Sequence, residues 1–165
     1  MQYLVKKGHH YSNHGIKYHF GITRKKFGFL FSPSCLYSIL SPKKNTSINK
    51  LFGWSYGHHH RNSVRVGWRP DTNGKIDLFF YLYNNGKNFT KYFETIEVSE
   101  EYEINITVSM YFVLFELYKA NNPLENIKKD THGFIRPWFR WGYYLWFYFG
   151  GKLPAPQDMT AYIFK

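Results

Sequence analysis

The sequence predicts an all-β fold, an antiparallel β-sandwich or jelly roll built as a single domain over residues 1–165. Aromatic residues make up 22% of the chain, and they favour pleated, half-buried strands over helices. Short alternating runs bounded by Gly, Asn, Pro and Ser recur along the sequence, with no amphipathic helix of about 12 residues between them. The length fits one domain, and 44% hydrophobic content is enough for one core.

Two strands are predicted in the N-terminal part. Residues 16–22 alternate, which places Ile16, Tyr18, Phe20 and Ile22 on one face and indicates a half-buried strand. Residues 27–31 form a short apolar run that stops at Ser32-Pro33-Ser34. Further along, residues 41–45 read as an exposed loop, because Pro, Lys and Asn cluster there.

A β-hairpin is predicted in the middle of the chain. Residues 76–83 and 89–98 are both strand-like, and Asn84-Asn85-Gly86-Lys87 lies between them. Asn-Gly readily adopts the positive φ angles that tight hairpin turns require. We therefore expect these two segments to pair.

The C-terminal part contains less regular patterns. Residues 103–108 alternate and continue into 110–118, which is either another strand or a short helix. Residues 124–133 are polar enough to form a loop. Residues 138–149 and 160–164 are predicted as the last two strands, joined by a Gly- and Pro-rich turn. We expect the first and last strands to pair, as in many sandwiches.

Charge is distributed unevenly along the chain. The first seventy residues contain neither Asp nor Glu but carry 12 Lys and Arg residues, whereas from Asp71 onward 10 basic residues face 11 acidic ones. The formal net charge of +11 therefore comes from the N-terminal part. Such asymmetry predicts an anionic partner with phosphate or carboxylate groups.

The segment 61–69 is the first candidate binding surface. On a strand, side chains alternate between faces, so Val64, Val66 and Trp68 would enter the core. The opposite face would then carry the candidate ligand-binding residues Arg61, Ser63, Arg65 and Arg69. Arginines four residues apart lie roughly 13 Å from each other on a strand, which suits an extended ligand with two phosphates. The alternative is a solvated strand face.

Histidines gather in two groups, His9-His10 with His14 and His58-His59-His60. On a strand, His58 and His60 would share a face and could chelate zinc if a third ligand came from elsewhere. No carboxylate lies nearby in sequence to orient the rings. We therefore predict no metal and no cofactor, and interpret His58 and His60 as hydrogen-bond donors at the rim of a ligand site.

Catalytic chemistry is not favoured by the sequence. Paired histidines could serve as base and acid in phosphodiester cleavage, but no combination of nucleophile, base and orienting group can be assembled from the motifs. The single Cys35 excludes an intramolecular disulfide and is consistent with a reducing compartment. We assign no catalytic residue.

Two further segments could contribute to a site. In residues 136–149, Arg140, Tyr144 and Trp146 would share a strand face that can stack a base or a sugar, or would simply cover a sheet edge. Their neighbours Trp141, Tyr143, Leu145, Phe147 and Phe149 would face the core. Lys152 follows Gly150-Gly151, which forms either a phosphate-binding nest or a plain connector.

Two stretches carry a resemblance, FGWSYGHHHRNSVRVGWR at residues 52–69 and YFGGKLPAPQDMT at residues 148–160. They resemble small β-sandwich proteins of low-GC bacteria and their phages, to which no established activity is attached. A small, basic, aromatic chain of this kind is also similar to phage sponges that sequester the nucleotide signals of bacterial immune systems. That resemblance implies a nucleotide-like ligand and an anti-defence role.

These observations predict a protein that captures a phosphorylated small molecule, a cyclic nucleotide or an ADP-ribose-type messenger. The alternatives are a single-stranded nucleic-acid binder, which would depend steeply on salt, a carbohydrate-binding module and a histidine-dependent phosphodiesterase. No apolar stretch approaches the roughly 20 residues of a membrane span and none resembles a signal peptide. We expect a soluble, cytoplasmic protein without membrane partners that could form a homo-oligomer.

Overall fold

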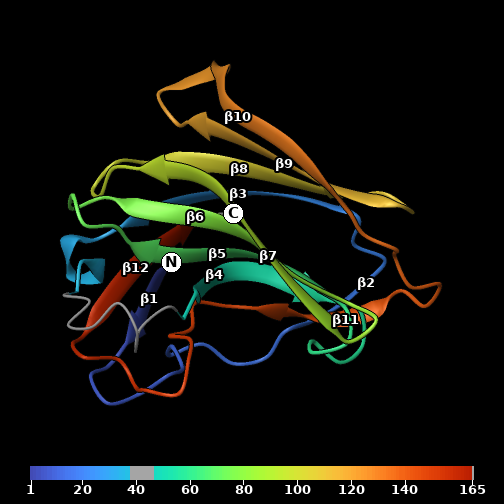
Figure 1. Ribbon diagram of the computed structural model, residues 1–165, viewed down its shortest axis with the longest axis horizontal. Helices are drawn as coiled ribbons and strands as arrows, with labels where there is room; N and C mark the ends of the chain where they lie inside the picture. The colour runs from blue at the N-terminus through green and yellow to red at the C-terminus, as the bar shows by residue number, and fades with distance from the viewer. Residues whose placement is uncertain (38–46, 165) are drawn as a thin grey trace.

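The fold is described from a computed structural model that covers residues 1–37 and 47–164 (Figure 1). The loop predicted at residues 41–45 lies outside these residues. The strands, in chain order, are β1 (Gln2–Val5), β2 (Tyr18–Phe20), β3 (Arg24–Phe31), β4 (Asn49–Ser55), β5 (Ser63–Pro70), β6 (Ile76–Asn84), β7 (Lys87–Ile96), β8 (Tyr102–Val108), β9 (Phe112–Lys119), β10 (Asn122–Gly133), β11 (Trp141–Leu145) and β12 (Met159–Phe164). A short 3-10 turn, η1 (Pro33–Cys35), follows β3.

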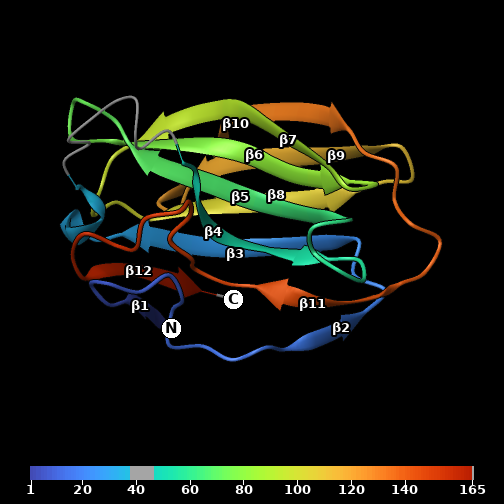
Figure 2. The same ribbon diagram turned by 60° about the horizontal axis from the view of Figure 1, so that its bottom comes forward.

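The described strands form two six-stranded antiparallel sheets that pack face to face, so the predicted all-β sandwich is confirmed. The pocket sheet, named for the site described below, has the order β2-β11-β4-β5-β6-β7, and the second sheet has the order β1-β12-β3-β8-β9-β10. Strands β1 and β2 lie along the same edge of the sandwich, at the bottom of Figure 2.

The core lies between the two sheets and is rich in aromatic rings. Alternate side chains of each strand point inward, as the period of two requires. Among them, buried and packed in one cluster, are Phe27, Phe29, Phe31, Val64, Val66, Trp68, Leu78, Phe80, Leu82, Ile104, Ile106 and Val108. The predicted inward face of the 61–69 segment is therefore confirmed.

Two pairings follow the sequence prediction. Strands β6 and β7 form the expected hairpin, and Asn85 and Gly86 at its turn have φ angles of 50° and 81°. Positive φ at both central residues matches the twist of the flanking strands. The first and last strands also pair, with Gln2 opposite Tyr162.

The prediction of a loop at residues 124–133 was wrong, because β10 spans Asn122–Gly133 and pairs with β9. This strand lies at the edge of the second sheet, with a partner on one side only. Charged side chains are common on exposed edge strands, where they discourage pairing with other chains. The polar composition therefore marked an edge strand rather than a loop. The neighbouring segment 110–118, left open as strand or helix, forms β9.

Two other strand predictions were only partly correct. Residues 138–149 do not form one strand, since β11 stops at Leu145 and Tyr148 makes only isolated bridges. Residues 16–22 contain only the three-residue β2, and Ile16, Tyr18 and Phe20 point into solvent rather than into the core. Alternation shows which side chains share a face, but not which face another layer covers.

The register of β4, β5 and β6 positions the site. Arg65 lies opposite Gly53 on β4 and Tyr81 on β6. Directly opposed residues point to the same face, so Tyr81 flanks Arg65 on the face turned away from the core. At Gly53 the backbone of β5 lies too close for a side chain, because a methyl group there would lie 2.0 Å from the Val64 carbonyl oxygen. Within residues 1–37 and 47–164, no helix is long and apolar enough to cross a membrane.

Candidate functional site

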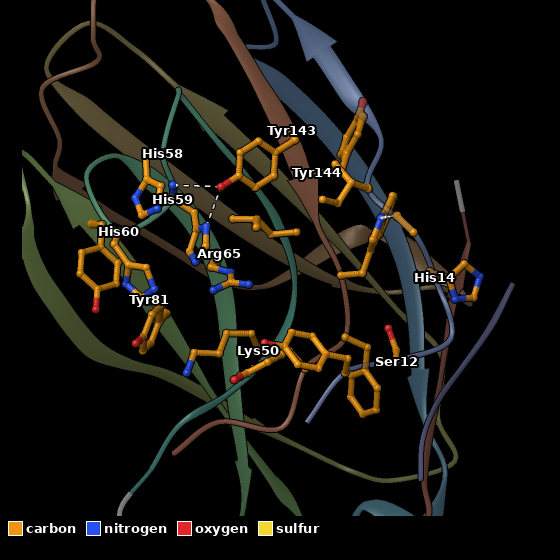
Figure 3. A pocket seen from close by; sticks show the side chains of 18 of the residues that line it. Ser12, His14, Lys50, His58, His59, His60, Arg65, Tyr81, Tyr143 and Tyr144 are labelled. Atoms are coloured by element: carbon orange, nitrogen blue, oxygen red, sulfur yellow. Dashed lines mark hydrogen bonds between the residues drawn. The ribbon is translucent and has the colours of Figure 1, made fainter. Parts of the chain in front are cut away.

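A pocket of about 640 Å³ opens on the outer face of the pocket sheet. Its floor comes from β4, β5 and β6, and its walls come from residues 11–16, the turn 58–60 and residues 143–148. Figure 3 shows cations near the middle of the pocket, the three consecutive histidines on one side, and Tyr144 and His14 on the other. The pocket therefore joins segments that are far apart in sequence.

Among the described residues, Arg65 is one of two buried cations that line the pocket. Only 8% of its surface is exposed, and its Nε has no hydrogen-bond partner. No ion pair to a carboxylate is formed by Arg65 in the described part of the chain. Burial lowers its pKa to about 10, against the opposing effect of the phenols of Tyr81 and Tyr148. Arg65 still carries its charge at neutral pH.

Lys50 is the second buried cation, also 8% exposed. Its Nζ lies 4.4 Å from the ring centroid of Tyr81 and 5.7 Å from that of Tyr148, so two aromatic faces contact the ammonium group. Burial, and secondly the charge of Arg65, lower the pKa of Lys50 to about 8. Gly150 makes room for this side chain, since a Cβ there would lie 2.7 Å from Lys50 Nζ.

The three consecutive histidines occupy the turn between β4 and β5 rather than a strand. Their rings form a cluster, with centroid separations of 5.0 Å for His58 and His59 and 4.3 Å for His59 and His60. His59 Nδ1 is hydrogen-bonded to Tyr143 Oη at 2.6 Å. Burial, followed by the charge of Arg65, lowers the pKa of His59 to about 4, so its ring is neutral at pH 7.

The described residues contain no group of three His, Cys, Asp or Glu side chains placed to hold a metal ion. His14 lines the same pocket as His58, but the two lie on opposite sides of it (Figure 3). His10 hydrogen-bonds the Phe149 carbonyl oxygen through Nδ1 at 2.9 Å. Of the first histidine group, His14 lines the pocket, whereas His9 and His10 do not.

An aromatic wall closes the side of the pocket away from the histidine turn. The rings of Tyr144 and Trp146 are stacked, with centroids 5.3 Å apart and an interplanar angle of 15°. Trp146 Nε1 donates a hydrogen bond to the Gly15 carbonyl oxygen at 3.1 Å, which fixes the indole. A fixed, flat aromatic surface of this kind can stack a planar ring.

Five of the ten residues predicted from the sequence line the pocket, namely His58, His60, Arg65, Tyr144 and Trp146. The sequence prediction gave Arg61, Arg65 and Arg69 the same role. Of these three arginines, Arg65 lines the pocket. These five side chains come from β5, from the turn before it and from the chain at and just after β11.

The other three residues predicted from the 61–69 segment lie outside the pocket. Arg61 precedes the first residue of β5 and is exposed in the turn. Ser63 is buried, and its hydroxyl donates to the His59 carbonyl oxygen at 2.8 Å. Arg69 Nε lies 3.6 Å from an Asp77 carboxylate oxygen, and its guanidinium lies 5.1 Å from the Phe79 ring centroid. Arg61 and Arg69 therefore do not line the pocket, and their contribution to ligand binding stays a prediction.

Arg140 and Lys152 are exposed and also lie outside the pocket. Arg140 precedes β11, so it does not continue the face predicted for a longer strand. Gly151 reaches the pocket lining, whereas the next residue, Lys152, points to solvent. Trp141, predicted to face the core, is 53% exposed.

Sequence reasoning missed Lys50, Tyr81 and Tyr143 as pocket residues. Tyr81 could have been found, because it alternates with core residues of the predicted hairpin and therefore shares its outer face. Tyr143 was assigned to the core on the assumption of a long regular strand. Lys50 carries no local pattern that distinguishes it from the exposed lysines.

The fold and the pocket together define the class of the protein. It is a β-sandwich whose one sheet carries a cationic pocket with aromatic walls. No family model matches the chain, and no curated protein matches it.

Solved structures similar to this chain include phage proteins with β-rich folds. The CBM2 module of the evolved Dit protein of Lactobacillus casei BL23 phage J-1 superposes with a TM-score of 0.50 at 9% identity, over 98% of this chain and 74% of that one. Tailspike protein 2 of Escherichia coli O157:H7 bacteriophage CAB120 gives a TM-score of 0.47 at 10% identity, over 86% of this chain and 19% of that one.

A Scytalido-glutamic peptidase gives a TM-score of 0.43 at 10% identity. The match covers 98% of this chain but only 62% of the peptidase chain. At 9% identity, the likeness to the CBM2 module shows the fold alone. The site has to be interpreted from its own residues.

Proposed function

We propose that the pocket binds and sequesters a phosphorylated small molecule that also carries a flat ring, such as a nucleotide. The observation that carries this proposal is the pair of buried cations, Arg65 and Lys50, which form no carboxylate ion pair in the described residues. Removing two charges from water without an opposite charge is costly. A phosphate bound between them would supply that opposite charge through short, charge-assisted hydrogen bonds.

The surroundings of the two cations favour phosphate. A guanidinium offers two parallel donors that match two phosphate oxygens, and an ammonium group adds a point charge. The phenol of Tyr143 and the neutral imidazole of His59 already form a hydrogen-bonded pair at the rim. They can reorient donors toward additional oxygen atoms of a ligand without an additional charge in the site.

The second part of the proposed ligand is planar. Tyr144 lies on the side of the pocket opposite the histidine turn (Figure 3), and its ring is stacked with that of Trp146. A volume of about 640 Å³ falls within the usual range of roughly 300–1,000 Å³ for small-molecule sites. A nucleotide would place its phosphate against Arg65 and Lys50 and its base against the aromatic wall.

Capture rather than conversion is the form of activity that we propose. Ion pairing at one end of the ligand and stacking at the other would supply the affinity. Cyclic nucleotides and ADP-ribose-type messengers combine these two features. A phage-encoded sponge that withdraws such a messenger from a bacterial immune system would need no further chemistry.

Titration calorimetry tests the proposal. The purified protein is titrated with cyclic dinucleotides, ADP-ribose, linear nucleotides, a single-stranded oligonucleotide and a neutral oligosaccharide. We expect binding of at least one phosphorylated small molecule, which chromatography then recovers unchanged. Arg65→Gln should weaken it about 100-fold, whereas the matched variant Arg69→Gln should change it less than about threefold, because Arg69 already pairs with Asp77.

Two results would contradict the proposal. In the first, the oligonucleotide is the one ligand that binds, its affinity falls steeply with salt, and Arg65→Gln and Arg69→Gln weaken its binding equally. This result would indicate a nucleic-acid groove. Binding of the oligosaccharide alone, unaffected by Arg65→Gln, would assign the pocket to carbohydrate recognition.

A further inference from the structure

We infer that Lys50 is a carbonyl-reactive lysine, which forms an imine with the aldehyde group of a phosphorylated ligand. Reducing sugars with a phosphate group, including the open-chain form of an ADP-ribose-type molecule, belong to this chemical class. The inference rests on the proposed function, because Arg65 has to hold the ligand's phosphate in the pocket before the aldehyde can meet the amine. For a ligand that carries an aldehyde, Lys50 is then the nucleophile and not the partner of the phosphate.

The position of the amine supports this role. Lys50 lines the pocket but is only 8% exposed, so its Nζ meets a ligand inside the pocket rather than bulk solutes. The rings of Tyr81 and Tyr148 flank it at 4.4 and 5.7 Å. The backbone of Lys50 is anchored as well, since Lys50 and Tyr148 exchange two backbone hydrogen bonds of 2.9 Å. The amine is thus held in one place.

Lys50 differs from the other lysines whose partners the structure describes. Lys75, Lys91 and Lys129, for example, lie 2.6, 2.6 and 3.0 Å from carboxylate oxygens, and their side chains are between 44% and 60% exposed. A carboxylate partner favours the charged, unreactive ammonium form. Lys50 has aromatic faces and Arg65 beside it instead.

Only a neutral amine attacks a carbonyl carbon, and this environment favours neutrality. Desolvation, together with the neighbouring cation Arg65, lowers the pKa of Lys50 to about 8. The other titratable groups near it are the phenols of Tyr81 and Tyr148 and the ring of His60. A lysine activated by a hydrophobic pocket or a second cation is a known route to Schiff-base formation.

The reaction is a condensation that balances without any further reactant. The Nζ lone pair forms a bond to the aldehyde carbon, and the resulting carbinolamine loses its hydroxyl group with a proton as water, leaving a C=N bond. Hydrolysis reverses the step and returns the intact aldehyde. Covalent capture of this kind would slow ligand release while leaving sequestration reversible.

The probe for the test is pyridoxal 5′-phosphate, which combines a phosphate, a flat ring and an aldehyde. After incubation at pH 8, sodium borohydride reduces any imine to a stable secondary amine, and peptide mass spectrometry locates it. We expect one dominant adduct at Lys50, lost in Lys50→Arg and retained in Lys152→Arg, whose lysine is exposed beside the pocket. Labelling at Lys50 should reach its plateau at a pH roughly two units lower than labelling of exposed lysines.

A second probe, 4-deoxypyridoxine 5′-phosphate, separates the inference from the proposed function, because it has the phosphate and the ring but no aldehyde. If this compound or a nucleotide binds while pyridoxal 5′-phosphate labels Lys50 no faster than exposed lysines, the imine is refuted and the pocket function stands. If no phosphorylated compound binds, the proposed function fails and the inference fails with it.

Discussion

The outer faces of the two sheets place their basic side chains in opposite environments. On the second sheet, Lys26 pairs with Glu103, and Lys129 Nζ lies 3.0 Å from a Glu116 oxygen on the neighbouring strand. On the pocket sheet, Arg65 and Lys50 are buried beside phenol rings, with no such ion pair in the described residues.

The difference shows that a basic composition does not by itself make a binding surface. Lys26 and Lys129 on the second sheet are exposed and paired with a carboxylate on a neighbouring strand, which is the ordinary state of a solvated face. Arg69 shows the same on the pocket sheet, because Asp77 occupies the position opposite it on β6. A cation that could pair with a ligand is one whose neighbouring side chains shield it from water but carry no opposite charge.

The largest expected effect contrasts two glycines, one in each sheet. A methyl group at Gly53 on β4 would lie 2.0 Å from the Val64 carbonyl oxygen, whereas one at Gly28 on β3 would meet only the Phe164 side chain, at 3.3 Å. We expect Gly53→Ala to lower the free energy of unfolding by more than about 3 kcal/mol and Gly28→Ala by less than about 1 kcal/mol. Urea denaturation measures both changes in the free energy of unfolding. Equal changes would show that β4 and β5 can move apart to accommodate the methyl group with little loss of stability.

The next effect concerns the stability cost of an unpaired buried cation. Lys50→Met should raise the free energy of unfolding at pH 7 by about 1–3 kcal/mol, because an apolar side chain replaces a buried ammonium group. The lowered pKa of Lys50 fixes the sign of the pH dependence. The penalty is present in full below pH 8 and disappears as the pH rises toward 10.5, the pKa of lysine in the unfolded chain.

Urea denaturation of wild type and Lys50→Met at pH 7 and pH 10 checks this expectation as a difference between the two proteins. The stability advantage of the variant should shrink at the higher pH. A variant that is less stable than wild type at pH 7 would mean that Lys50 has a stabilising partner. Lys50 would then no longer count as an unpaired cation of the pocket.

A smaller effect is expected from acid. The folded protein keeps His59 neutral down to a pKa of about 4, below the ordinary 6.5. As the pH falls from 6.5 to 4, the unfolded chain binds a proton that the folded chain does not, so stability decreases. Because the ring is partly exposed, screening reduces the loss to on the order of 1 kcal/mol.

The variant His59→Asn removes this titration and should show a flatter stability curve between pH 6.5 and 4. Thermal denaturation of both proteins across this range gives the comparison. Parallel curves would indicate that His59 takes up its proton in the folded state as readily as in the unfolded chain.

The smallest effect belongs to the second sheet. Glu103→Gln removes the partner of Lys26, whose side chain is 55% exposed. The free energy of unfolding should change by less than about 0.5 kcal/mol, since exposed ion pairs contribute little. A loss above about 1 kcal/mol in chemical denaturation would remove the contrast between the two sheets.

Several features of the fold could be predicted from local patterns. The hairpin of β6 and β7 follows from alternation and an Asn-Gly turn, both of which act within about twenty residues. The inward face of β5 follows from period two alone. Strand β10 could not be recognised in this way, because an edge strand with both faces largely exposed has no alternating apolar pattern.

Alone, the sequence determined the fold class and the face of β5 that carries Arg65, and it predicted an anionic ligand. These depend on composition and on periods of two residues, which act along the chain. The tertiary structure decided that Asp77 neutralises Arg69, that Lys50 and Tyr81 lie beside Arg65, and that Tyr144 and Trp146 form the opposite wall. Each of these facts depends on strand register and order, which bring distant residues within a few ångströms and which no local pattern encodes.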